Sequence, residues 1–246
     1  MINSKIKFPA YILSGFLFTN VLYGATDPSL YKSGAYTGAL LGYSLMNSTI
    51  KEDNLIPLFP VSINGTGKSH QSNNGIVGDF LLGYRHFFEN QFLLGAELDF
   101  SLDNNEVTQT THGLGTGSKS KTKYKAPFKF TPALVFGKQF NQKLLGFIKL
   151  GMSIAQFKGS HTLISRGAPG AISNFRTTRN GFMGAIGAEY ALSNTFSTVG
   201  ILAYECFSKF HNSYEDPSGM GLPGSSNAAS IKPEYVTAKI GIVYRF

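Results

Sequence analysis

Several features that are common in proteins are scarce or absent in this chain of 246 residues. It has no tryptophan, one cysteine (Cys206), and charged side chains at only 15% of its positions. A single cysteine excludes an intramolecular disulfide and a zinc site made of several cysteines. Beyond residue 25 no apolar run is long enough for a transmembrane helix. The mean hydropathy of -0.03 is also too polar for a helical membrane protein.

Glycine and aromatic side chains, in contrast, are plentiful, with 28 glycines and 13% aromatic residues. The length admits one large all-β domain or two small domains. This composition suits a structure whose apolar surface is spread over alternating positions. The formal net charge of +8 is typical of nucleic-acid binding, but lysine and arginine are dispersed along the chain. We therefore expect no nucleic-acid partner.

The first residues have the pattern of a secretory signal. Lys5 and Lys7 precede a mostly apolar stretch over 8–22, and the small residues Gly24 and Ala25 follow. The pattern predicts a cleaved signal peptide at 1–24 and a mature domain at 25–246. The alternative is an uncleaved anchor, for which the stretch is short, because a span needs about 20 apolar residues. No cysteine lies near the cleavage site, which disfavours a lipoprotein.

The main structural signal is alternation with period two, which places successive side chains on opposite faces of a β-strand. Between Gln91 and Asp103, for example, every second residue is apolar, and the other positions carry Gly, Glu, Asp and Ser. Eight segments show this pattern: 34–46, 75–88, 91–102, 124–140, 144–157, 180–192, 195–210 and 233–246. Their charged residues fall on the face opposite the apolar one. Such charges fit the lumen of a barrel.

The connections between these segments alternate between short and long. Residues 89–90, 141–143 and 193–194 are tight turns, whereas 47–74, 103–123, 158–179 and 211–232 are long and polar. Soluble domains rarely contain so many long structureless connections. Outer-membrane barrels have short turns on the periplasmic side and long loops outside. We therefore predict an all-β fold, an eight-stranded antiparallel up-and-down transmembrane β-barrel, in preference to a soluble sandwich. Pro127 and Pro132 interrupt the fourth segment, which predicts a bulge or a projection beyond the bilayer.

The ordered motifs resemble those of a known family. They are Tyr36-Thr37-Gly38-Ala39, Leu82-Gly83-Tyr84-Arg85, Leu94-Gly95-Ala96-Glu97-Leu98-Asp99, Phe147-Ile148-Lys149-Leu150-Gly151 and Gly184-Ala185-Ile186-Gly187-Ala188-Glu189-Tyr190-Ala191-Leu192. Together they resemble the outer-membrane β-barrel porin family of opacity-like proteins and alphaproteobacterial 25/31-kDa surface antigens, which is related to the OmpA-like transmembrane barrel. The resemblance runs over 35–246 and implies a Gram-negative outer-membrane location. In the seventh segment, Tyr204-Glu205 reverses the family's usual order and lacks its arginine, so no particular ion pair is implied there.

Ten ionisable residues are expected to face the lumen, five acidic and five basic. They are Asp79, Arg85, Glu97, Asp99, Lys129, Lys149, Glu189, Glu205, Lys239 and Arg245. An eight-stranded barrel is barely wide enough for its own side chains, so we expect an ion-pair network that fills the lumen. A narrow permeation path lined by the same residues is the alternative.

The last segment carries a second candidate site. One face holds Ala238, Ile240, Ile242, Tyr244 and the terminal Phe246. The family resemblance implies that this face is the insertion signal read by the barrel-assembly machinery. An ordinary amphipathic strand that ends in phenylalanine is the alternative. Aromatic residues that cluster beside the predicted short turns fit a girdle at the membrane interface.

The third long connection concentrates positive charge at Lys158, Arg166, Arg176 and Arg179, with no acidic neighbour. Such a basic extracellular loop suits the phosphates of lipopolysaccharide in the outer-membrane lipid, or a host surface ligand such as a sulfated glycan. Solvated loop charge is the alternative.

The histidines lie in separate segments with no spacing typical of a triad or metal site, so we expect no enzyme and no cofactor. Two functions remain: a structural, surface-antigen barrel with long loops for adhesion, or a small passive diffusion channel.

Overall fold

The computed structural model describes residues 30–58, 61–112, 119–165, 168–215 and 226–246. The predicted signal peptide at 1–24 lies outside these residues. None of the described residues forms a helix long and apolar enough to cross a membrane.

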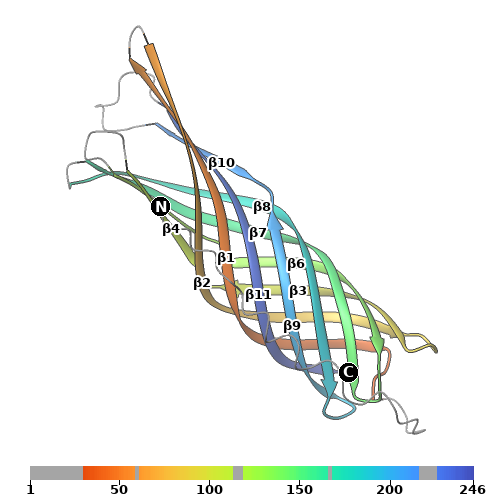
Figure 1. Cartoon of the computed structure of the whole chain (residues 1–246). Helices are drawn as coiled ribbons and strands as arrows, with labels where there is room; N and C mark the ends of the chain where they lie inside the picture. Colours follow the sequence, from red (N-terminus) through yellow and green to blue (C-terminus); the bar gives the residue numbers. More distant parts are fainter. Residues whose placement is uncertain (1–29, 59–60, 113–118, 166–167, 216–225) are drawn as a thin grey trace, which may run out of the picture.

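Eleven strands form one antiparallel sheet (Figure 1). Their bounds are β1 (Gly34–Leu58), β2 (Val61–Phe87), β3 (Phe92–Asp103), β4 (Glu106–His112), β5 (Lys119–Lys125), β6 (Phe128–Gln139), β7 (Leu144–Ser165), β8 (Ala168–Ala191), β9 (Phe196–Phe207), β10 (Phe210–Glu215) and β11 (Ser226–Arg245). Eight of them close a barrel in chain order: β1, β2, β3, β6, β7, β8, β9 and β11. The closing seam joins β1 to β11 from the pair Tyr36 and Arg245 up to the pair Leu55 and Ser226. The predicted fold class is confirmed.

The alternation in the sequence becomes the two faces of the barrel wall. In β2, Phe80 and Leu82 are exposed on the outside, whereas Asp79, Leu81 and Arg85 are buried inside. The other barrel strands repeat this arrangement. The outer wall therefore carries exposed large apolar side chains, as a lipid-facing surface requires, and the charges lie in the interior.

The tight turns lie at one end of the barrel and are held by local hydrogen bonds. Between β6 and β7, the side-chain oxygen of Asn141 accepts hydrogen bonds from the backbone N–H groups of Lys143 (2.9 Å) and Leu144 (2.8 Å). Between β8 and β9, the Ser193 hydroxyl accepts one from the N–H of Phe196 (3.0 Å). Short polar side chains bond their own backbone in this way and favour turns over continued strand.

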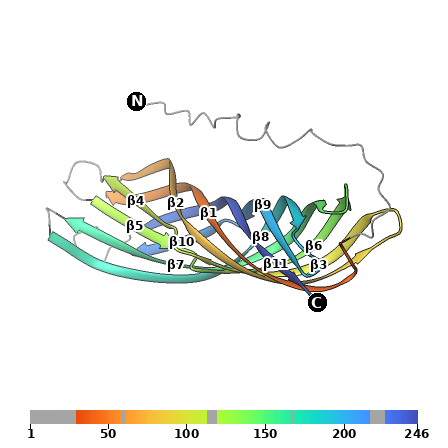
Figure 2. The ribbon, with the colours of Figure 1, turned by 90° about the horizontal axis from the view of Figure 1, so that it is seen from below.

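The long connections differ from the prediction of structureless loops. Residues 47–58 and 61–74 continue β1 and β2, and 158–165 and 168–179 continue β7 and β8. The other two long connections contain β4, β5 and β10. These extensions all lie at the end of the barrel opposite the C-terminus (Figure 2). The sequence pattern missed them because strands in water have polar residues on the outer face, so apolar alternation fades while the backbone ladder continues.

The fourth predicted segment is divided by its prolines. Pro127 lies between β5 and β6, and Pro132 lies inside β6 opposite Leu98 of β3. On the other side of β6, the pairing with β7 passes from Phe130–Ile154 to Ala133–Gly151 and skips the two residues between, with no change of register. The expected bulge at Pro132 is therefore wrong. The proline is accommodated because its missing N–H removes a ladder bond toward β7 without displacing the strand.

The gap in the β6–β7 ladder leads to a prediction about stability. Replacing Pro132→Val restores the missing donor, and we expect the free energy of unfolding to rise by about 1 kcal/mol, the net value of one hydrogen bond. Urea titration of the refolded barrel in detergent measures this change. Pro127→Val is the matched control, since Pro127 lies outside the strands, and it should leave the urea midpoint unchanged. An unchanged or lowered midpoint for Pro132→Val would contradict the explanation.

Candidate functional site in the barrel interior

All ten ionisable residues predicted to face the lumen lie on the inner face of the barrel. Nine are buried, and Lys239 is nearly so, with 12% of its side chain exposed. They form three groups along the barrel axis, and each group joins residues from several strands. The groups are described in order, starting from the end with the short turns.

The first group is centred on Glu189 of β8. Its carboxylate accepts hydrogen bonds from Arg85 (2.7 Å) and from the Ser197 hydroxyl (2.5 Å), and Arg245 lies at 3.4 Å. Two cations thus share one buried carboxylate. The guanidinium of Arg85 also stacks on the ring of Tyr36, 3.7 Å from its centroid, which disperses part of the excess positive charge.

The second group contains two lysines. Lys149 forms an ion pair with Glu97 and lies 3.7 Å from the carboxylate of Asp99. The Tyr36 hydroxyl donates a hydrogen bond to the other oxygen of Glu97 at 2.7 Å, so that both oxygens are satisfied. Lys239 of β11 forms an ion pair with Asp79 of β2.

Two glycines make room for these contacts. β1 runs between β11 and β2, so the side chain of Lys239 has to cross it to reach Asp79. Gly42 of β1 lies directly opposite Lys239, and a Cβ atom there would come within 2.7 Å of the Cγ atom of the lysine. Gly83 serves the ring of Tyr36 in the same way, because an added Cβ would lie 2.5 Å from the ring. These two glycines therefore leave the space that the side chains of Lys239 and Tyr36 occupy.

The third group surrounds Lys129 of β6. Its ammonium lies 2.5 Å from Glu205 and 3.7 Å from Asp103, and 4.3 Å from the ring centroid of Tyr235. The Ser153 hydroxyl donates a second hydrogen bond to Glu205 at 2.7 Å. The reversed Tyr204-Glu205 order thus still gives Glu205 a cationic partner, which comes from a distant strand.

Apolar side chains lie among the charged groups at the turn end and beyond them at the hairpin end. Toward the short turns, a turn-end cluster includes Leu93, Val135, Leu145, Val199 and Val243. Toward the long hairpins, a loop-end cluster is formed by buried aromatic and aliphatic side chains. Its members include Met46, Ile50, Tyr124, Phe157, Phe207, Phe210, Ile231 and Tyr235. Phe157 packs on Phe207 and Phe210 with ring centroids 5.4 Å apart in both pairs.

Tyr31 closes the turn end. It precedes β1 and is 4% exposed. Its hydroxyl donates toward the backbone carbonyls of Glu189 (2.8 Å) and Lys143 (3.0 Å), and the guanidinium of Arg245 lies 4.8 Å from its ring centroid. Burial raises the pKa of the Tyr31 phenol, so the group remains protonated and able to donate.

Two small cavities lie beside the charged groups in the interior. One cavity of about 10 Å³ lies beside Tyr36, Arg85 and Glu97, and another of about 10 Å³ lies beside Asp99, Thr131 and Lys149. Each has the size needed for one water molecule. In the part of the chain that the structure describes, no group of three or more His, Cys, Asp or Glu residues is placed to hold a metal ion.

The sequence analysis missed several members of the interior network. Asp103, Tyr31, Tyr36, Ser153 and Ser197 were not included. Asp103 lies on the same face of β3 as Glu97 and Asp99, so the alternation in the sequence could have identified it as an inward-facing residue. The serines and tyrosines gave no comparable signal, because their partners come from other strands.

Most of the other candidate residues that the structure describes lie on the outer wall. Ala238, Ile240, Ile242, Tyr244 and Phe246 all face outward, and the ring of Tyr244 packs on Phe196 (5.2 Å) and Phe246 (5.0 Å). Lys158 and Arg176 are exposed on β7 and β8. They belong to the strand extensions of β7 and β8 and not to a structureless loop. Arg179 faces inward, 5.7 Å from the ring centroid of Phe210, and Arg166 lies outside the described residues.

Comparison with known proteins adds information about the fold. No family model and no curated sequence matches the chain. Among solved structures, outer membrane protein OprG from Pseudomonas aeruginosa is similar over 89% of this chain and 99% of that one, with 15% identity and a TM-score of 0.56. A major outer membrane protein from Thermus thermophilus aligns with 84% of this chain and 99% of its own, at 14% identity and a TM-score of 0.41. Ail from Yersinia pestis aligns with 87% and 99%, at 14% identity and a TM-score of 0.28. The likeness to OprG shows that the chain has the β-barrel fold of an outer-membrane protein.

The shared carboxylate of Glu189 leads to a second prediction. Glu189→Ala leaves Arg85 and Arg245 buried without a counter-charge, and we expect the free energy of unfolding to fall by about 3–5 kcal/mol. Urea titration of the refolded barrel in detergent measures the loss.

The control for this variant is an exposed ion pair. Glu234 lies 3.0 Å from Lys232 on the surface of β11, where 48% of the lysine side chain is exposed. Glu234→Gln should leave the urea midpoint unchanged, because solvent screens such pairs. Equal effects of the two substitutions would show that the interior pairs do not stabilise the barrel.

Proposed function

We propose that this protein is an integral outer-membrane β-barrel with a closed lumen, whose role is structural and that of a surface antigen. One observation supports this most strongly. Ion pairs and two apolar clusters occupy the described interior along its axis, and the two cavities beside the charged groups are each about the size of one water molecule. A passive diffusion channel, the alternative, needs a continuous aqueous path.

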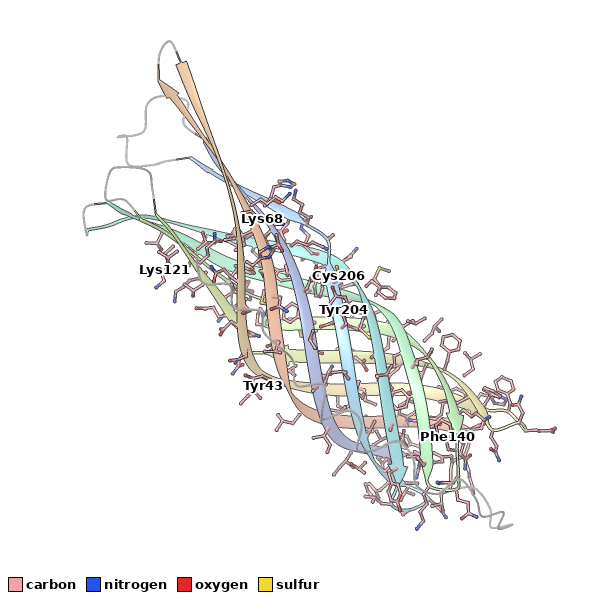
Figure 3. All side chains as sticks on the ribbon, viewed as in Figure 1. Tyr43, Lys68, Lys121, Phe140, Tyr204 and Cys206 are labelled. Atoms are coloured by element: carbon pink, nitrogen blue, oxygen red, sulfur yellow. The ribbon has the colours of Figure 1, made fainter. Side chains whose placement is uncertain are left out.

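The outer wall supports the membrane location. Exposed apolar residues cover it, and an aromatic group lies beside the short turns, formed by Phe88, Phe92, Phe140, Tyr190, Phe196, Tyr244 and Phe246. Such a band with an aromatic border fits a bilayer interface. In Figure 3, Phe140 lies near the turn end, whereas Lys68 and Lys121 lie toward the opposite end. The turn end then faces the periplasm, and the polar hairpins project outside the cell, where they would contact a host surface.

The finer assignments belong to the same proposal. Export would use the signal peptide at 1–24, and the outward face of β11 that ends at Phe246 would be read by the barrel-assembly machinery. The ordered strand motifs support membership of the opacity-like group of outer-membrane porins. No catalytic role or cofactor is part of the proposal.

The location is tested by fractionating the membranes of a Gram-negative host that expresses the full chain. We expect the protein in the outer-membrane fraction, with a gel mobility that changes on boiling because a folded barrel resists SDS. Recovery in the soluble or inner-membrane fraction would refute the proposed location.

The closed lumen is tested separately by single-channel recording. Purified protein in planar bilayers should produce no steady openings, because the filled interior leaves no water path for ions. A general porin measured in the same bilayers provides the positive control. Steady, ion-selective openings would favour the diffusion channel and overturn the closed-lumen proposal.

A further inference from the structure

Three cations form a row across the outer wall at the hairpin end of the barrel. Lys125 of β5 pairs in register with Lys158 of β7, and Lys158 pairs in register with Arg176 of β8. All three side chains are exposed. Residues directly opposite each other on antiparallel strands point to the same face, with Cβ atoms about 5 Å apart. The row is a continuous line of positive charge over three strands.

The protein supplies this row with almost no negative charge. Like charges directly opposite each other destabilise a sheet, and here two such pairs follow in succession. The only acidic residue in β5, β7 and β8 is Glu189, which is buried near the other end of the barrel. On β4, Glu106 lies opposite Lys125, but its carboxylate pairs with Lys123 at 3.2 Å. A row of like charges is unfavourable in the isolated protein. It therefore indicates that an anion binds to the row from outside.

The height of the row on the wall indicates which anion. The outward-facing apolar residues of β7 run through Ile148, Leu150 and Met152 to Ile154, and Lys158 follows four residues later. At about 3.3 Å per residue and a strand tilt of about 40°, Lys158 lies about 10 Å above the end of this apolar run. Lysine and arginine direct long apolar stems toward the membrane while the charge stays in the polar layer. The charges then reach the level of lipid headgroups.

We propose that Lys125, Lys158 and Arg176 bind the phosphate groups of lipopolysaccharide in the leaflet around the barrel. This inference rests on the proposed outer-membrane location. The planar guanidinium of Arg176 is suited to bidentate phosphate binding, and the two lysines act as point charges beside it. Lys121, which is labelled in Figure 3, adds a further positive charge along β5.

The binding test uses the refolded full chain in detergent micelles with purified lipopolysaccharide as the probe. Each cation near an anionic surface contributes roughly fivefold in affinity, so the triple variant Lys125→Ser, Lys158→Ser, Arg176→Ser should bind roughly 100-fold more weakly. The control removes three exposed lysines at the turn end: Lys32→Ser, Lys138→Ser, Lys143→Ser. It changes net charge equally and should bind like the wild type. Unchanged binding by the first triple variant would overturn the proposal.

A single substitution separates binding from folding. Lys158→Glu places a carboxylate between Lys125 and Arg176, converting both like-charge pairs into ion pairs. Without lipopolysaccharide, its urea midpoint should rise, whereas its affinity for lipopolysaccharide should fall at least tenfold. Loss of binding in a more stable protein cannot come from misfolding. A lowered midpoint, or full binding by this variant, would contradict the proposal.

Two further arms identify the source of the anion. Dephosphorylated lipopolysaccharide should bind the wild type as weakly as intact lipopolysaccharide binds the triple variant. Heparin serves as a soluble polyanion for comparison. If the substitutions weaken the binding of heparin but not that of lipopolysaccharide, the assignment of the row to a lipid is overturned. Fractionation tests the location independently. If the wild type is absent from the outer membrane, the proposed function fails. If the location is correct but the triple variant binds lipopolysaccharide like the wild type, only the proposed role of the row in lipopolysaccharide binding is refuted.

Discussion

A charge inside a barrel of eight strands has almost no water to solvate it, and the interior of this protein is organised around that constraint. An unpaired buried charge is expensive, and removing one partner of a buried pair costs far more than removing an exposed one. Each cation of the charged groups is therefore placed against a carboxylate. Where two cations share Glu189, the ring of Tyr36 takes up part of the positive charge of Arg85.

The wall, the clusters and the glycines follow from the same constraint. Strand alternation sends charges inward and apolar side chains outward, which suits lipid outside and ion pairs inside. Apolar side chains pack among the ion pairs at the turn end and beyond them at the hairpin end, and so limit their contact with bulk water. Gly42 and Gly83 have no side chain because Lys239 and Tyr36 occupy that space.

The sequence predicted the barrel strands and the residues that face inward, but not the partners of the ion pairs or the additional strands. Period-two alternation predicted the eight barrel strands and the inward parity of residues such as Glu97 and Lys149, because both depend on local geometry. It did not predict which cation meets which carboxylate, since Lys239 and Asp79 are separated by 160 positions along the chain. It also missed β4, β5 and β10, whose sequences have no apolar alternation. The lysines of β5 were overlooked for the same reason: only strand register places Lys125 beside Lys158.

The ion pair between Lys239 and Asp79 has a consequence for folding kinetics. It links the last strand to the second across β1, so it spans the closing seam from inside. Contacts between residues so distant in the chain form late, because a long loop must close before they can contribute. A contact absent from the transition state slows unfolding without speeding folding. The ion pair across the seam is therefore expected to slow the opening of the closed barrel and lengthen its lifetime, with little effect on the rate of folding.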